Sequence, residues 1–83
     1  MASNANWQSW VWVRWKANAL SNAWETWKSH SQVKSAWSTL GEWDCVLCVD
    51  ASTPDEVESF VWKNLRTNQW VDATHTTFAK KWW

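Results

Sequence analysis

Hydrophobic and polar residues follow different periods along this chain, and each change of period marks the end of a predicted element. Residues 7–16 (WQSWVWVRWK) are rich in aromatic and β-branched side chains, which is typical of a strand. Alternate residues of a strand share a face. One predicted face of this strand therefore carries Trp10, Trp12 and Arg14, and the opposite face carries Val11, Val13 and Trp15. Both faces are largely apolar, so we expect this strand to be covered on both sides.

Residues 18–30 change to a helical period. Apolar side chains recur there at helical spacing, at Leu20, Ala23, Trp24 and Trp27. Either Asn18 or Ser21 is a suitable cap for the start of this helix. The pattern therefore predicts a first helix between the first two strands.

A second helix is predicted from a capping motif. Thr53 is the cap, Pro54 takes the first helical position and Glu56 completes the capping box. A stripe of apolar residues at helical spacing follows, and the helix is expected to end near Arg66. The residues of the stripe are Val57, Phe60, Val61 and Leu65.

Three further strands are predicted over residues 33–40, 44–51 and 70–83. The single glycine of the chain lies in the sequence Gly41-Glu42-Trp43-Asp44, which predicts a tight turn between the second and third strands. On the second strand we expect one face to hold Val33, Ser35, Trp37 and Thr39. The element order β-α-β-β-α-β predicts an α+β, ferredoxin-like fold with both helices on one face of the sheet.

The other face of this sheet would be open and apolar. The chain has twelve Trp, and eight of them fall on or beside the predicted strands. A large exposed apolar surface usually marks an interaction site, so we expect a sheet-on-sheet dimer of the dimeric α/β-barrel type, with two-fold symmetry. The residues expected at the oligomer interface are Trp10, Trp12, Trp37, Trp82 and Trp83.

The length and the net charge of the chain limit the number of domains it can form and the partners it can bind. The 83 residues suit a single domain, residues 1–83, with residues 1–6 expected to be frayed. Eight Lys and Arg balance eight Asp and Glu, which argues against direct binding of nucleic acid or of an anionic membrane. No uncharged apolar stretch approaches the roughly 18 residues of a membrane span, and no signal peptide is predicted.

Cys45 and Cys48 are the only cysteines. Because residues three apart on a strand point to opposite faces, these two thiols are expected neither to form a disulfide nor to chelate one metal. No metal site and no cofactor are predicted. Free thiols fit a cytoplasmic location.

Several motifs resemble one family. The turn Gly41–Asp44 resembles a G-x-Y-D motif, with Trp43 in place of Tyr. In the second predicted helix, Glu58–Val61 together with Leu65-Arg66 resembles the motif E-x-F-V…L-R. In the last predicted strand, residues 71–76 (VDATHT) resemble V-x-x-T-x-T. Together they resemble the effector-binding (RAM) domain of the leucine-responsive/AsnC family of transcriptional regulators. The resemblance covers about residues 10–80, and the DNA-binding domain that usually precedes this module is expected to be missing.

This resemblance implies a non-enzymatic module for binding effectors and for oligomerisation. It implies dimers that associate into rings of four or five, that is octamers or decamers, with small effectors, typically amino acids, between dimers. It also implies possible co-assembly with full-length regulators of the family. The ligand-binding residues implied are Gly41, Glu42, Trp43, Asp44, Thr74 and Thr76.

The chemistry of an amino acid suits some of these residues. Asp44 can accept hydrogen bonds from an ammonium group, while turn N–H groups and hydroxyls can bind a carboxylate. The alternative is structural: Asp44 bonds local N–H groups in a hairpin turn, and Thr74 and Thr76 are ordinary strand residues.

Two other functions stay open from the sequence. One is a small dimeric α+β barrel enzyme of the haem- or antibiotic-monooxygenase type, whose relatives use Asn, Trp and His. No nucleophile–base pair is evident, so we expect no enzymatic activity. The other is a natural or engineered ring with a purely architectural role, in which Trp enlarges the contacts.

Overall fold

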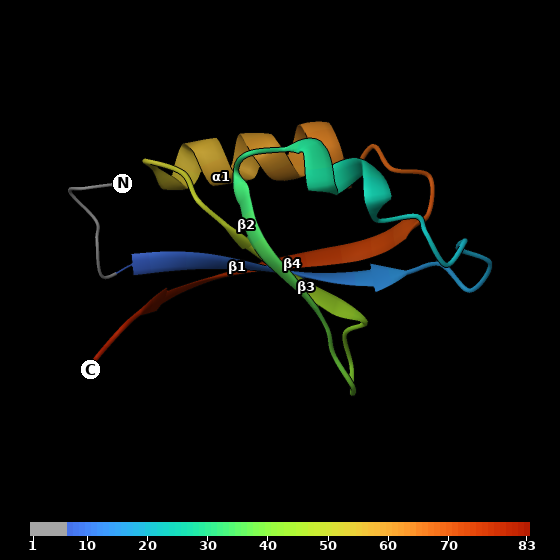
Figure 1. Ribbon diagram of the computed structural model, residues 1–83, viewed down its shortest axis with the longest axis horizontal. Coiled ribbons are helices and arrows are strands. Elements are labelled where there is room, and N and C mark those ends of the chain that lie inside the picture. The colour runs from blue at the N-terminus through green and yellow to red at the C-terminus, as the bar shows by residue number, and fades with distance from the viewer. Residues whose placement is uncertain (1–6) are drawn as a thin grey trace.

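The computed structural model describes residues 7–83, and the expected fraying of residues 1–6 lies outside that part. Four strands form one antiparallel sheet in the order β2-β3-β1-β4. Their bounds are Trp7–Trp15 for β1, Val33–Ser38 for β2, Cys45–Val49 for β3 and Val71–Lys80 for β4. The helical segments lie together on one side of this sheet, and its other face is bare (Figure 1). The predicted α+β, ferredoxin-like arrangement is confirmed.

The core lies between the sheet and the helical layer. Val11 and Val13 of β1 are fully buried there, whereas Trp10 and Trp12 point to the bare side, as predicted. The core cluster consists of Val11, Val13, Trp27, Leu47, Val49, Val57, Phe60, Val61 and Leu65. We call the bare side the open face. By strand pairing it carries Trp10, Trp12, Arg14, Ser35, Trp37, Val46, Cys48, His75 and Thr77.

The second predicted helix is confirmed. It comprises α1 (Pro54–Phe60), which continues into a turn of π-helix, η3 (Val61–Leu65). The Glu56 N–H donates to Thr53 Oγ1 at 3.2 Å, as the capping box predicts, whereas the Glu56 carboxylate accepts the N–H of Ser52, one residue before the cap, at 2.7 Å. Among the described residues, no helix is both long enough and apolar enough to cross a membrane.

The first predicted helix is wrong in extent. In place of a helix over residues 18–30, the chain forms turns and then a short 3-10 helix, η2 (Glu25–Ser29), without a side-chain cap. Asn and Ser, frequent in this stretch, compete with the helical backbone for hydrogen bonds. Only Trp27 of the predicted stripe is buried, and its indole stacks on Trp15 at 5.2 Å between ring centroids. One large aromatic pair thus covers the sheet where a full helix was expected.

The predicted face of the second strand is also partly wrong. The pairing of β2 with β3 shifts between Val33 and Ser35, so β2 contains a bulge at that point. Val33 lies opposite Val49 and packs against the core, whereas Ser35 and Trp37 lie on the open face. A bulge inserts one unpaired residue and so reverses the alternation of faces.

The two thiols point to opposite faces, as predicted. Cys45 pairs with Val13 on the helical side, and Cys48 pairs with Trp10 on the open face. Both are free cysteines. Burial raises the pKa of each thiol above its ordinary value, with smaller contributions from Asp44 at Cys45 and from Asp50 at Cys48. Thiols with a raised pKa are poor nucleophiles at neutral pH.

Candidate functional site

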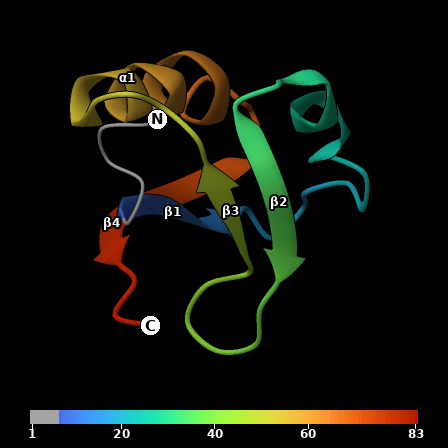
Figure 2. The ribbon, with the colours of Figure 1, turned by 60° about the vertical axis from the view of Figure 1, so that its left-hand side comes forward.

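The turn between β2 and β3 is held firmly to the sheet. Gly41 has φ +126°, a conformation that side chains other than glycine rarely adopt. Thr39 Oγ1 donates to the Trp43 carbonyl at 2.7 Å, and the Thr39 N–H donates to the Asp44 carbonyl at 3.0 Å. The Asp44 N–H in turn donates to the Val13 carbonyl of β1 at 2.9 Å. These bonds fix the positions of both Trp43 and Asp44; Figure 2 shows the turn extending beyond the sheet.

The turn sends two of its side chains to different sides of the sheet. Trp43 stacks on His75 of the open face at 6.0 Å between ring centroids, and the Arg14 guanidinium lies 5.3 Å from the centre of the Trp43 ring. The Arg14 side chain also forms a salt bridge with Asp72 at 3.1 Å. Asp44, by contrast, lines a cavity beside the helical layer.

This Asp44 cavity lies between η2 and the strands β2 and β3, and has a volume of about 260 Å³. Its residues are Trp15, Trp24, Trp27, Lys28, Val33, Ala36, Trp37, Ser38, Asp44, Cys45 and Leu47. An adjoining hollow toward Leu20 shares Trp15, Trp24 and Asp44 with it. Most of the lining is apolar, as is usual for small-molecule sites.

The indoles of the Asp44 cavity are held in place by hydrogen bonds. Trp27 Nε1 donates to the Asn64 carbonyl of η3 at 3.1 Å, and Trp24 Nε1 donates to the Ser21 carbonyl at 3.1 Å. Trp27 and Trp15 stack with an interplanar angle of 11°. Since its indole N–H group already has a partner, Trp24 offers mainly aromatic surface to a ligand, whereas Trp27 is 3% exposed and mainly supports the wall of the cavity.

Two opposite charges also line the cavity. One carboxylate oxygen of Asp44 accepts the Trp15 N–H at 2.8 Å, which orients the side chain and leaves the other oxygen for a further donor. The Lys28 ammonium lies 5.6 Å from the centre of the Trp24 ring. Within residues 7–83, the salt bridges join other residues, so Lys28 and Asp44 are not paired with each other.

Of the six predicted ligand-binding residues, only Asp44 lines this cavity. Gly41 and Glu42 are exposed in the turn. Thr74 and Thr76 lie opposite Val13 and Val11, on the helical side of β4, and thus on the other side of the sheet from Trp43. The structure therefore does not bring the six residues together within one chain.

Sequence reasoning missed most of the cavity lining. Lys28 and Trp24 reach the cavity because residues 25–29 form a 3-10 helix, which the sequence did not predict. Trp15 was placed correctly on the helical side of β1, but its stacking on Trp27 depends on that same local conformation. The sequence feature that could have indicated this part of the cavity is the presence of Trp24, Trp27 and Lys28 within five residues.

The residues predicted at the oligomer interface lie in two places. Trp10 and Trp12 are half-buried near the middle of the open face, and Trp37 on edge strand β2 is exposed. Trp82 and Trp83 follow β4 and are 86% and 93% exposed. The open face therefore presents an indole-rich surface to its surroundings.

Neither histidine lies in the Asp44 cavity. His30 packs edge-on against Phe60, with ring centroids 5.6 Å apart, and His75 stacks on Trp43. Within the described residues, no group of three or more His, Cys, Asp and Glu side chains could hold a metal ion. The arrangement around Asp44 suits the binding of a ligand.

The fold of this chain is shared with several solved structures. A protein from Thermus thermophilus is similar in structure, with a TM-score of 0.80 and 22% identity over 93% of this chain and 96% of that chain. A transcriptional regulator from Neisseria meningitidis, solved as a complex with L-Met, has a TM-score of 0.77 and 20% identity over 96% of this chain and 53% of its own. AsnC of E. coli has a TM-score of 0.78 and 13% identity over 96% and 54%.

The chain thus spans about half the length of these two regulators and almost all of the Thermus protein. A search of curated proteins gave no match. The sequence profile of one family, the Lrp/AsnC ligand-binding domain, matches residues 8–81. Because this match covers nearly every described residue and agrees with the fold, the chain belongs to the Lrp/AsnC ligand-binding domain family and is an effector-binding regulatory domain.

Proposed function

We propose that this domain binds a single amino acid as its effector in the Asp44 cavity, and that it assembles through the open face of its sheet. The observation that carries the first part is the pair of opposite charges, Asp44 and Lys28, on an otherwise apolar cavity. An amino acid presents one ammonium and one carboxylate on a single carbon. A site with one partner for each of these charges is complementary to it.

Each part of the ligand has a partner in the cavity. The carboxylate oxygen of Asp44 that is not bonded to Trp15 accepts from the ammonium, and the Lys28 ammonium binds the carboxylate. The ligand side chain packs mainly against the indole of Trp24, which is 42% exposed. The volume of about 260 Å³ suits one small molecule and favours an apolar amino acid over a peptide.

The open face supports the proposal of a dimer. Trp10, Trp12 and Val46 lie next to one another across β1 and β3, with Trp37 beside them on β2. A sheet of this kind is stable in water when its apolar face is covered by a second layer. A second copy of the same face, related by two-fold symmetry, is the simplest cover. Such dimers, in turn, are proposed to associate into rings.

Calorimetric titration of the purified domain with each of the twenty amino acids tests the first part. Loss of a charge-assisted hydrogen bond costs about 1.5–3 kcal/mol, so we expect Asp44→Asn and Lys28→Gln each to weaken binding roughly tenfold or more. Glu58→Gln and Lys63→Gln are matched controls, because they remove the same charges from exposed positions outside the cavity.

Two results would count against this proposal. Absence of binding by any amino acid to the folded wild-type domain would exclude the effector assignment. Equal weakening by the cavity variants and by their controls would show that a ligand binds elsewhere and responds only to overall charge.

A further inference from the structure

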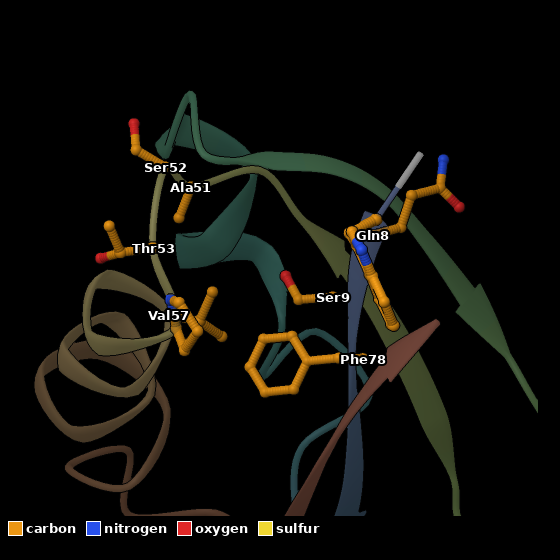
Figure 3. A pocket seen from close by; sticks show the side chains of 9 residues that line it. Gln8, Ser9, Ala51, Ser52, Thr53, Val57 and Phe78 are labelled. Carbon is orange, nitrogen blue, oxygen red and sulfur yellow. The ribbon is translucent and has the colours of Figure 1, made fainter. Parts of the chain in front are cut away.

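A second cavity lies at the opposite end of the helical layer, between the start of α1 and the ends of β1 and β4 (Figure 3). It has a volume of about 300 Å³ and shares no residue with the Asp44 cavity. Its residues are Trp7, Gln8, Ser9, Ala51, Ser52, Thr53, Pro54, Val57 and Phe78. We call it the Ser9 cavity.

The Ser9 cavity exists because small side chains stand where the core would need large ones. Ser9 continues the inward-facing series of Val11 and Val13 toward the start of β1, yet it is much smaller than valine. Ala51 lies across from it, after β3. In Figure 3, the Val57 side chain lies beside the Phe78 ring, and Ser9 lies above that ring.

Ser9 and the start of α1 contribute polar groups to this cavity that already have partners. Ser9 is 5% exposed, and its hydroxyl donates to the Val49 carbonyl. Thr53 Oγ1 accepts the Glu56 N–H, and the Ser52 N–H donates to the Glu56 carboxylate. Pro54 has no N–H to offer. No charged side chain lines the cavity, so nothing in its lining is complementary to an ion.

Two aromatic side chains line the cavity and still reach solvent. Trp7 is 45% exposed and Phe78 is 42% exposed, one from β1 and one from edge strand β4. The Lys80 ammonium lies 5.8 Å from the centre of the Trp7 ring, and thus steadies that indole. A flat ring placed between these aromatics and Val57 would gain contact with all of them.

We propose that the Ser9 cavity is a second ligand site, which takes an uncharged, flat aromatic molecule of one or two rings. It differs from the Asp44 cavity in its chemistry, because it lacks the pair of opposite charges that an amino acid requires. The two cavities lie on either side of the same core cluster. Val57 of that cluster lines the Ser9 cavity, and Leu47 of the same cluster lines the Asp44 cavity.

Ligand-observed saturation-transfer NMR with toluene and indole as probes tests this site. Both probes are expected to bind the wild-type domain, and benzoate, which resembles toluene but carries a charge, is expected to bind at least tenfold more weakly than toluene. Ala51→Leu fills the cavity and is expected to weaken toluene binding at least tenfold. Ser59→Leu is the matched control, because it adds the same kind of side chain at an exposed position of α1.

Phe78→Ala provides a second variant if Ala51→Leu fails to fold, since Phe78 is only half-buried and its removal leaves the core intact. We expect this variant also to lose toluene binding. Amino-acid binding by the Phe78→Ala and Ala51→Leu domains is expected to stay at the wild-type level, which separates this site from the Asp44 cavity.

Three results would overturn the proposal. One is the absence of toluene and indole binding by the wild type. Another is unchanged toluene binding in both Ala51→Leu and Phe78→Ala together with its loss in Trp24→Ala, which would place the aromatic probe in the Asp44 cavity. The third is benzoate binding as tight as that of toluene.

Discussion

Cys45 ties the stability of this domain to pH. Burial of its thiol, with the Asp44 carboxylate as a second cause, raises its pKa from the ordinary 9.0 to about 11. The folded protein therefore keeps the Cys45 proton at pH values where the unfolded chain loses it. The stability contributed by this proton is fully present below about pH 9 and is lost as the pH rises toward 11.

We therefore expect the free energy of unfolding to fall by about 1–2 kcal/mol between pH 8 and pH 11 because of Cys45. This decrease is smaller than the full shift of the Cys45 pKa implies, because water still reaches the thiol. Urea unfolding at a series of pH values, in the presence of a reductant, measures this decline. Cys45→Ala should make the decline shallower by that amount. Cys48→Ala, which removes the other thiol, should leave most of it; an equal effect of both variants would contradict the role of Cys45.

Thr53 fixes the start of α1 through one hydrogen bond. Thr53→Ala removes the acceptor of the Glu56 N–H, and we expect it to lower the free energy of unfolding by about 1 kcal/mol. Urea unfolding monitored by circular dichroism measures the change. Ser59→Ala, an exposed substitution in the same helix, is the control, and a loss of equal size there would point to a cause other than capping.

Among the elements, η2 depends most on a single residue. Trp27 is 3% exposed, stacks on Trp15 and donates to the Asn64 carbonyl, so it joins the 3-10 helix to both β1 and η3. Trp27→Ala should cost about 3–5 kcal/mol by leaving a large cavity. Trp27→Phe keeps a ring but leaves the Asn64 carbonyl without its donor, and should cost about 1–3 kcal/mol.

Chemical denaturation measures both Trp27 variants, with Trp24→Ala as the control. Trp24 is 42% exposed and its indole bonds only to the nearby Ser21 carbonyl, so its loss should cost much less. Equal costs for Trp24→Ala and Trp27→Ala would contradict the view that η2 is anchored by Trp27.

The elements differ in how far the sequence predicts them. The second helix and β1 follow from local signals, because a capping motif and a run rich in aromatic and β-branched residues act within a few residues. The first helix and the face of Val33 do not. There the outcome depends on contacts between distant residues, such as Trp27 with Trp15, and on a bulge that no local pattern marks.

The candidate site shows the same division. Asp44 could be predicted because the turn residues themselves carry the motif and the glycine that the turn requires. Lys28 could not, since its position beside Asp44 depends on η2 packing over β2 and β3. Thr74 and Thr76 were predicted on the correct strand, β4. In the sheet, however, β1 lies between β4 and β3, and the Asp44 cavity lies beside β3 and β2, away from β4.

In the whole molecule, the proposed function assigns ligand binding to the helical side of the sheet and dimer formation to the open face. The helical side holds the core and both cavities, so ligands meet the domain there. The open face carries Trp10, Trp12 and Trp37, and no helical segment of the described residues covers it, so a second copy can pack there. Of the open-face residues named above, Trp37 alone also lines the Asp44 cavity. A variant at Trp10 or Trp12 that blocks assembly of the dimer should therefore still bind a ligand whose contacts all lie within one chain.

Trp12→Glu tests assembly through the open face. Trp12 lies between Val46 and His75 in the pairing of β3, β1 and β4, so its replacement would bury a carboxylate in the middle of a sheet-on-sheet interface. A buried, unpaired charge is strongly unfavourable, so we expect this variant to be a monomer of 9.8 kDa. For the wild type we expect a dimer, or a ring of eight or ten copies.

Sedimentation velocity and light scattering of the purified proteins distinguish these masses. Trp62→Glu is the matched control, because Trp62 is 60% exposed on η3, on the helical side of the sheet, and should leave the assembly intact. A wild-type domain that stays monomeric at the highest measurable concentration, or a Trp12→Glu variant that assembles like the wild type, would show that the open face is not the interface.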